Sequence, residues 1–84
     1  DFVDPAWHVV GEIADAVEAQ DAAAVGAAGH KLKSSARAVG ANELADLSLS
    51  LEKAGKSDDW AVINVEFPKL RPIMQPIAAH ISDL

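Results

Sequence analysis

The sequence contains no cysteine and no tyrosine, and phenylalanine and tryptophan contribute only two residues each. Without cysteine, the chain has neither disulfide bonds nor thiolate ligands for a metal. It also lacks the run of roughly 18 apolar residues that a membrane-spanning helix requires, and its start shows none of the regions of a signal peptide. We therefore expect a cytoplasmic domain without direct membrane contact.

Acidic residues predominate overall but are missing from one segment. The net charge is −6, which disfavours binding to nucleic acid because phosphate groups attract a basic surface. Between residues 22 and 42 there is no Asp or Glu, whereas Lys31, Lys33 and Arg37 all lie within this segment. The segment predicts a local basic surface that favours an acidic protein partner.

Length and composition indicate one small helical domain. A chain of 84 residues has room for a single hydrophobic core, and an alanine-rich sequence favours closely packed helices. We predict one domain over residues 1–84 and a monomer. Because residue 1 is Asp, we also expect the chain to be a piece of a longer protein.

Four segments carry apolar residues at the three- and four-residue steps of an amphipathic helix. Asp4 and Pro5 fit the start of the first helix, as its N-cap and first helical residue, and we predict that this helix ends near Ala19. Asp21 and Gly40 fit the two ends of the second helix. Short connections between helices of this kind predict an all-α fold, an antiparallel four-helix bundle.

The third helix is predicted from Asn42, as its N-cap, to Gly55, and the fourth from residues 57–59 to the end of the chain. The fourth helix contains three prolines at four-residue intervals. An interior proline removes one backbone hydrogen bond and costs about 3 kcal/mol. We therefore expect this helix to be bent or interrupted at Pro68, Pro72 and Pro76.

His30 is predicted to face solvent on the second helix. At 100° per residue it points about 140° away from Val25, which belongs to the stripe that we expect to be buried. This stripe comprises Val25, Ala28, Leu32, Ser35 and Val39. Gly26 and Ser34, one turn before and after the histidine, are predicted to lie on the exposed side and are too small to cover the imidazole.

The basic side chains near His30 have predicted roles of their own. Lys33 is three residues further along the helix, so its ammonium group is expected to reach an anion carried on the imidazole. Arg37 is two turns away and is expected to contact an acidic partner, with Lys31 at the periphery. The segment thus predicts an accessible histidine that a large partner can approach.

Other interpretations of His30 are open. An acid–base pair or triad needs a carboxylate, and none lies within one helical turn, so another helix would have to supply it. A metal site would draw on His8, His30 and His80, which lie on three predicted helices without the i, i+4 pairing of metal ligands. An exposed histidine beside lysines is also an ordinary solvated surface.

The stretch HKLKSSARAVGANELADLSLSLE, residues 30–52, resembles the signature of the histidine phosphotransfer (HPt) domains of bacterial phosphorelays. The positions that match are His30, Leu32, Lys33, Ser35, Ala36, Gly40, Ala41, Leu51 and Glu52. Ser34 departs from the signature, which has glycine there. The resemblance implies a four-helix bundle in which His30 accepts a phosphoryl group from the aspartyl phosphate of a receiver domain and passes it to a second receiver.

The resemblance also implies roles for other residues and for partners. Lys33 would stabilise the phosphoryl group, and the domain would be a phosphocarrier without an ATP site. It would bind no cofactor itself, since the partner receiver would hold the magnesium. Its parent would be a hybrid sensor kinase, with this domain as a cytoplasmic part. Residues expected at the receiver interface are Gly26, Lys31, Ser34 and Arg37.

Three alternatives stay open at this point. The first is a docking module for an acidic protein, in which His30 is never phosphorylated. The second is a phosphoacceptor of the chemotaxis-kinase type, which receives phosphate from an ATP-binding domain. A purely structural bundle is the third alternative, and it would bind no receiver.

Overall fold

The chain is described by a computed structural model over residues 3–82, with side chains described for residues 3–77 and for Ala79. No strand occurs within this range, so the predicted all-helical class is confirmed. The elements are α1 (Val3–Glu18), α2 (Ala22–Ala38), α3 (Asn42–Lys56), α4 (Trp60–Glu66), the 3-10 turn η1 (Phe67–Lys69) and α5 (Leu70–Ser82).

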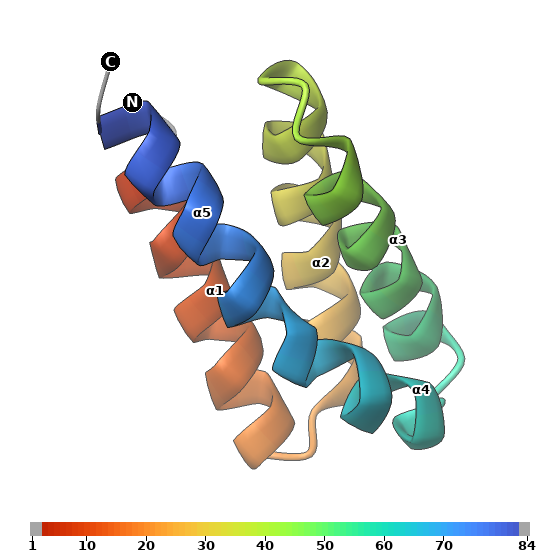
Figure 1. The fold of residues 1–84 in the computed structure, drawn as a ribbon. Coiled ribbons are helices and arrows are strands. Elements are labelled where there is room, and N and C mark those ends of the chain that lie inside the picture. Colours follow the sequence, from red (N-terminus) through yellow and green to blue (C-terminus); the bar gives the residue numbers. More distant parts are fainter. Residues whose placement is uncertain (1–2, 83–84) are drawn as a thin grey trace.

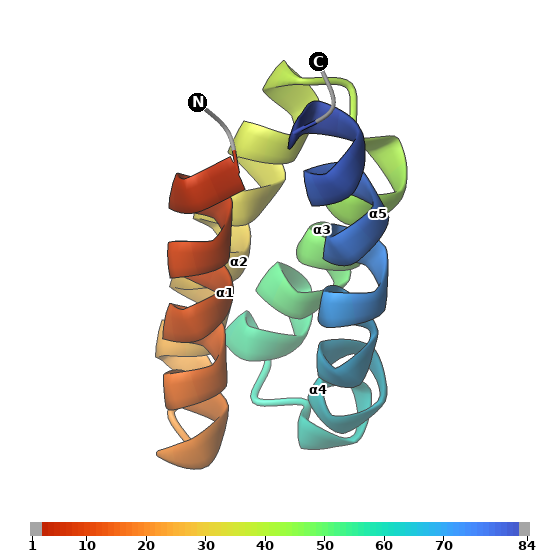
Figure 2. The ribbon, with the colours of Figure 1, turned by 60° about the vertical axis from the view of Figure 1, so that its left-hand side comes forward.

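The helices form an elongated bundle, 38 Å long and 19 by 18 Å across. Short turns join α1 to α2 at one end of the bundle and α2 to α3 at the other, and α4, η1 and α5 then lead back along the remaining side (Figure 1). The start of α1 and the end of α5 lie at the same end (Figure 2). No helix within residues 3–82 is both long enough and apolar enough to cross a bilayer.

Local signals fix several helix ends. The Asp21 side chain accepts a hydrogen bond from the Ala24 backbone N–H at 3.1 Å, as its prediction as N-cap of α2 requires. Asp59 does the same for α4, accepting from the Val62 N–H at 3.3 Å. Gly40 follows α2 with φ of 75°, a left-handed conformation that glycine adopts without strain. The position of the turn between α2 and α3 is therefore determined by a local residue, Gly40.

Two predicted caps are wrong. α1 already begins at Val3, so Asp4 lies in its first turn rather than at the N-cap. α3 begins at Asn42 with Ala41 as its N-cap residue, and no side chain caps this end. Each helix end is shifted by one or two residues, a displacement that leaves the packed faces unchanged.

The last predicted helix is divided into α4, η1 and α5. Pro68 lies in η1, where it has no N–H to donate, and the Leu70 N–H bonds to the Phe67 carbonyl oxygen with the tighter 3-10 spacing. Pro72 and Pro76 lie within α5, which continues past both of them. Of the three positions where a bend or interruption was predicted, only Pro68 lies at an interruption, and α5 is continuous at Pro72 and Pro76.

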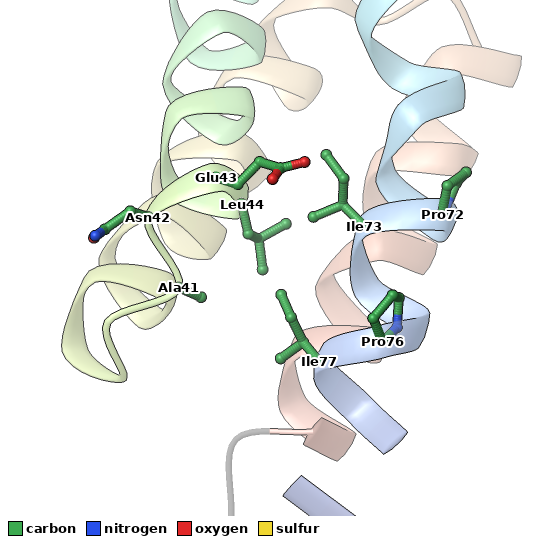
Figure 3. Close-up of a pocket in the computed structure, with 8 residues that line it drawn as sticks. All are labelled: Ala41, Asn42, Glu43, Leu44, Pro72, Ile73, Pro76 and Ile77. Atoms are coloured by element: carbon green, nitrogen blue, oxygen red, sulfur yellow. The ribbon is translucent and has the colours of Figure 1, made fainter. Parts of the chain in front are cut away.

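A cavity of about 440 Å³ lies between the start of α3 and α5 (Figure 3). Pro72 and Pro76 share the face of α5 that borders it, and Ile73 and Ile77 point toward Leu44 across it (Figure 3). The residues that line it are Ala41, Asn42, Glu43, Leu44, Pro72, Ile73, Pro76 and Ile77. The prolines therefore help shape a largely apolar groove at the end of the bundle away from α4.

All five helices contribute buried apolar residues to the core. In α3 the apolar residues at three- and four-residue steps are all buried: Leu44, Leu47, Leu51 and Ala54. The stripe predicted for α2 is partly wrong, because Ser35 is exposed and Val39 is 50% exposed. The buried residues of α2 are Ala22, Val25, Gly26, Ala28, Gly29, Leu32 and Ala36. The buried face of α2 therefore differs from the predicted one: it includes the side of the helix that carries Gly26 and Gly29.

Candidate functional site

Three glycines let α2 and α3 pack backbone against backbone. A Cβ atom on Gly55 would lie 2.6 Å from the Ala22 carbonyl oxygen, and one on Gly29 would lie 3.0 Å from the Glu52 amide nitrogen. A Cβ on Gly26 would lie 3.2 Å from the Glu52 carbonyl oxygen. Consistently, α2 and α3 form the most extensive helix pair of the bundle. The glycines therefore bring Glu52 of α3 close to the side of α2 that carries His30.

This packing corrects the predicted place of Gly26. The helical spacing predicts Gly26 on the exposed side, where its small size would admit a partner protein. In the structure Gly26 is buried against the backbone of α3, so it is not part of an accessible interface. The error arose because the buried stripe was defined from apolar side chains alone, whereas glycine contributes to a helix interface by letting another backbone approach.

The imidazole of His30 is exposed and held at one nitrogen. Its side chain is 59% exposed, as predicted, and Nδ1 lies 2.8 Å from Glu52 Oε2. The ring makes no hydrogen bond through Nε2 to any residue in the described part of the chain. A carboxylate only accepts, so Nδ1 carries the hydrogen that it donates, and in the neutral ring Nε2 then carries the free lone pair.

Glu52 is the centre of a cluster of four side chains. Its side chain is only 6% exposed, and its Oε1 accepts a hydrogen bond from Lys33 Nζ at 2.6 Å. Oε2 accepts from His30 Nδ1 and also from Lys56 Nζ, at 3.2 Å. The hydrogen bond from Lys33, followed by those from His30 and Lys56, lowers the pKa of Glu52 to about 2. The carboxylate is therefore ionised at neutral pH and can hold the imidazole in place.

Lys33 is less free than its sequence position suggested. Its side chain is 13% exposed and is bound to Glu52, so it is not extended toward solvent. Both Lys33 Nζ and His30 Nδ1 contact the same carboxylate. Lys33 therefore lies next to the histidine, as predicted, but Glu52 connects the two groups.

The remaining predicted residues lie on the outer surface. Lys31 is exposed and pairs with Glu12 of α1 at 2.7 Å, and this hydrogen bond lowers the pKa of Glu12. Ser34 is exposed, and its hydroxyl donates to the carbonyl oxygen of His30 at 3.2 Å. Arg37 is exposed and makes no ion pair with any described residue. The basic surface is thus partly neutralised, because carboxylates of α1 and α3 bind its lysines.

Glu52 has no predicted role beyond its match to the signature, and Lys56 has none. The sequence of α3 does, however, contain a second stripe of residues at three- and four-residue steps, beside the leucine stripe. It consists of small residues with one carboxylate among them, which is the pattern of a close helix contact holding a charged group. Its members are Ala45, Ser48, Glu52 and Gly55, all of them buried.

The structure offers no support for a metal site within the described residues, because no three His, Asp or Glu side chains converge there. His8 is exposed, with Nε2 3.5 Å from Glu12 Oε1. The side chain of His80 lies outside the described residues.

Fold and site together define a helical domain that presents the His30 imidazole to solvent and orients it with a buried carboxylate. The Hpt domain family model matches residues 1–80 of the chain. The chain therefore belongs to the Hpt domain family, and it has the family's histidine phosphotransfer role in phosphorelays, as a phosphocarrier that interacts with receiver domains. Comparisons with curated proteins and with solved structures gave no match.

Proposed function

We propose that His30 accepts a phosphoryl group on Nε2 from the aspartyl phosphate of one receiver domain and donates it to a second. One observation carries this proposal: Glu52 binds Nδ1 at 2.8 Å, which leaves Nε2 of a 59% exposed ring without a partner among the described residues. A nucleophile for phosphoryl transfer has to be accessible, correctly oriented and unprotonated at the reacting atom. In the neutral ring, His30 Nε2 combines these three properties.

The transfer step needs no proton movement within this domain. The lone pair of Nε2 attacks phosphorus, the N–P bond forms, and the O–P bond breaks as the receiver's aspartate leaves as a carboxylate with the bonding electrons. Nδ1 keeps its hydrogen, so the phosphorylated ring carries a positive charge. Glu52 faces that charge through the hydrogen bond to Nδ1. Transfer to the second receiver is the same step reversed.

The rest of the domain provides access and charge. Lys33 adds a cation beside the ring, which favours the negatively charged phosphoryl group as it arrives. The Ser34 hydroxyl donates to the His30 carbonyl oxygen of its own helix. The side chain therefore stays close to the helix surface at the position where the family signature has glycine. The exposed Arg37 favours an acidic receiver surface, and the receiver would contribute the magnesium ion. In this proposal the antiparallel four-helix bundle is a rigid support for one imidazole.

The test is transfer of radiolabelled phosphate from a phosphorylated receiver to this 84-residue chain. We expect label on the wild type and none on His30→Gln. His8→Gln is the matched control, because His8 is also an exposed histidine beside a carboxylate, and this variant should be labelled like the wild type. Equal labelling of His30→Gln would exclude His30 as the acceptor.

The same experiment separates the competing functions. A receiver that binds the wild-type chain but transfers no label would indicate a docking module. Labelling only by an ATP-dependent kinase domain, and not by any receiver, would indicate a phosphoacceptor of the chemotaxis-kinase type.

A further inference from the structure

Lys56 belongs to the cluster around His30, although it lies 26 positions further along the chain. Its Nζ donates to Glu52 Oε2 at 3.2 Å, and this is the oxygen that His30 Nδ1 contacts at 2.8 Å. Lys33 binds the other oxygen, Oε1. Oε2 therefore has two donors, and one of them is the ring that receives the phosphoryl group under the proposed function.

Competition for one oxygen has a direct electrostatic consequence. A carboxylate oxygen that already accepts from an ammonium group carries less negative charge for a second donor, so the Nδ1–H···Oε2 bond is weaker than it would be without Lys56. The weaker bond disfavours the phosphorylated histidine relative to the free one, because the phosphorylated ring is positively charged and gains more from this hydrogen bond.

We propose that Lys56 is a positioning residue that raises the phosphoryl-transfer potential of His30 by competing with the imidazole for Glu52 Oε2. This inference rests on the proposed function and adds a regulating group to it. Lys56 does not touch the phosphoryl group and acts through Glu52. Its role is to keep the phosphorylated histidine from becoming too stable, so that the group passes on to the next receiver.

The chain provides matched variants. Lys56→Gln removes the ammonium group, and Lys56→Arg keeps a positive charge within reach of Glu52. Lys53→Gln is the control, because Lys53 lies on the same helix and is exposed, and its side chain has no partner among the described residues. Lys56→Gln and Lys53→Gln change the net charge of the protein equally, so a difference between them reports on the contact with Glu52.

The first measurement uses the unphosphorylated protein. In Lys56→Gln the Nδ1–H proton resonance of His30 should move downfield, as expected for a stronger hydrogen bond to Glu52, and the 15N shifts should show more of the tautomer protonated at Nδ1. Lys53→Gln and Lys56→Arg should match the wild type. Identical His30 spectra in Lys56→Gln and Lys53→Gln would overturn the proposed competition.

The second measurement is the equilibrium of the phosphoryl group between the chain and a receiver. Lys56→Gln should shift it toward phosphorylated His30 by roughly two- to fivefold, the scale of one exposed ion pair, while Lys56→Arg and Lys53→Gln leave it unchanged. An unshifted equilibrium in Lys56→Gln would overturn the inference but not the proposed function. Absence of phosphate on wild-type His30 would overturn the proposed function, and with it the role of Lys56 in transfer, whatever the first measurement shows.

Discussion

Gly55→Ala is the substitution that most sharply tests how the site is assembled. A Cβ at this position would lie 2.6 Å from both the Ala22 carbonyl oxygen and the Gly26 Cα atom. These are backbone atoms, which cannot rotate away as a flexible side chain would, so α2 and α3 would have to separate. Overpacking of this kind costs typically 1–3 kcal/mol, and the backbone contacts place Gly55 near the upper value.

The helix propensity of alanine offsets part of that cost. Replacing an interior helical glycine by alanine stabilises the helix by about 1 kcal/mol, so the net destabilisation of Gly55→Ala should be about 2 kcal/mol. A domain of this size has about 4 to 13 kcal/mol of stability in total, and the variant should therefore still fold. Urea denaturation measures the free energy of unfolding, and its midpoint should fall.

Gly11→Ala is the matched control. Gly11 lies within α1 and is exposed, and a Cβ there would meet nothing within 4 Å. This variant should gain about 1 kcal/mol from helix propensity alone, so the two variants should differ by about 3 kcal/mol. Equal stability of Gly55→Ala and Gly11→Ala would refute the close contact of α2 with α3. The separated helices should also lengthen the His30–Glu52 hydrogen bond and move the Nδ1–H resonance upfield.

Four further predictions concern the cluster and its access. Glu52→Gln should slow phosphoryl transfer to His30 by roughly tenfold, the scale of a hydrogen bond to a charged group, as measured by quenched-flow labelling; an unchanged rate would remove Glu52 from the mechanism. Because the pKa of Glu52 is lowered to about 2 from an ordinary 4.5, its contribution to stability is complete above about pH 4.5 and is lost as the pH falls toward 2. The urea midpoint should fall more steeply over that window in the wild type than in Glu52→Gln, and parallel curves would contradict the assigned pKa. Lys33→Gln should slow transfer by roughly tenfold, since it keeps a donor for Glu52 but removes the charge, and wild-type kinetics would remove its proposed role. Ser34→Trp should abolish transfer from a receiver while leaving the free energy of unfolding within about 0.5 kcal/mol of wild type, as for an ordinary surface change; normal transfer would place the docking surface elsewhere.

Features encoded by neighbouring residues could be predicted from the sequence. Asp21 and Gly40 mark the ends of α2 through hydrogen bonds and a backbone conformation that involve only a few adjacent positions. The exposure of His30 also followed from helical geometry, because the ring points far from Val25 and Leu32 in any regular helix. Local chemistry was therefore sufficient for the helices and for the side of α2 that carries the histidine.

Features that depend on contacts between helices could not be predicted in the same way. Hydrophobic periodicity takes no account of glycine, so the burial of Gly26 and Gly29 against α3 was missed. The same limitation hid Glu52, which lies 22 positions from His30 and reaches it only because the glycines let the two backbones approach. The apparent basic surface was overestimated for a related reason, since Glu12 of α1 neutralises Lys31.

The most direct test of the account is to identify the phosphorylated atom. The chain would be labelled with 15N in its histidine rings, phosphorylated by a receiver and studied by NMR for one-bond coupling between phosphorus and nitrogen. We predict coupling to Nε2 of His30, with Nδ1 still protonated and bonded to Glu52. Coupling to Nδ1, or to a nitrogen of another histidine, would contradict the claim that Glu52 holds this imidazole for transfer at Nε2.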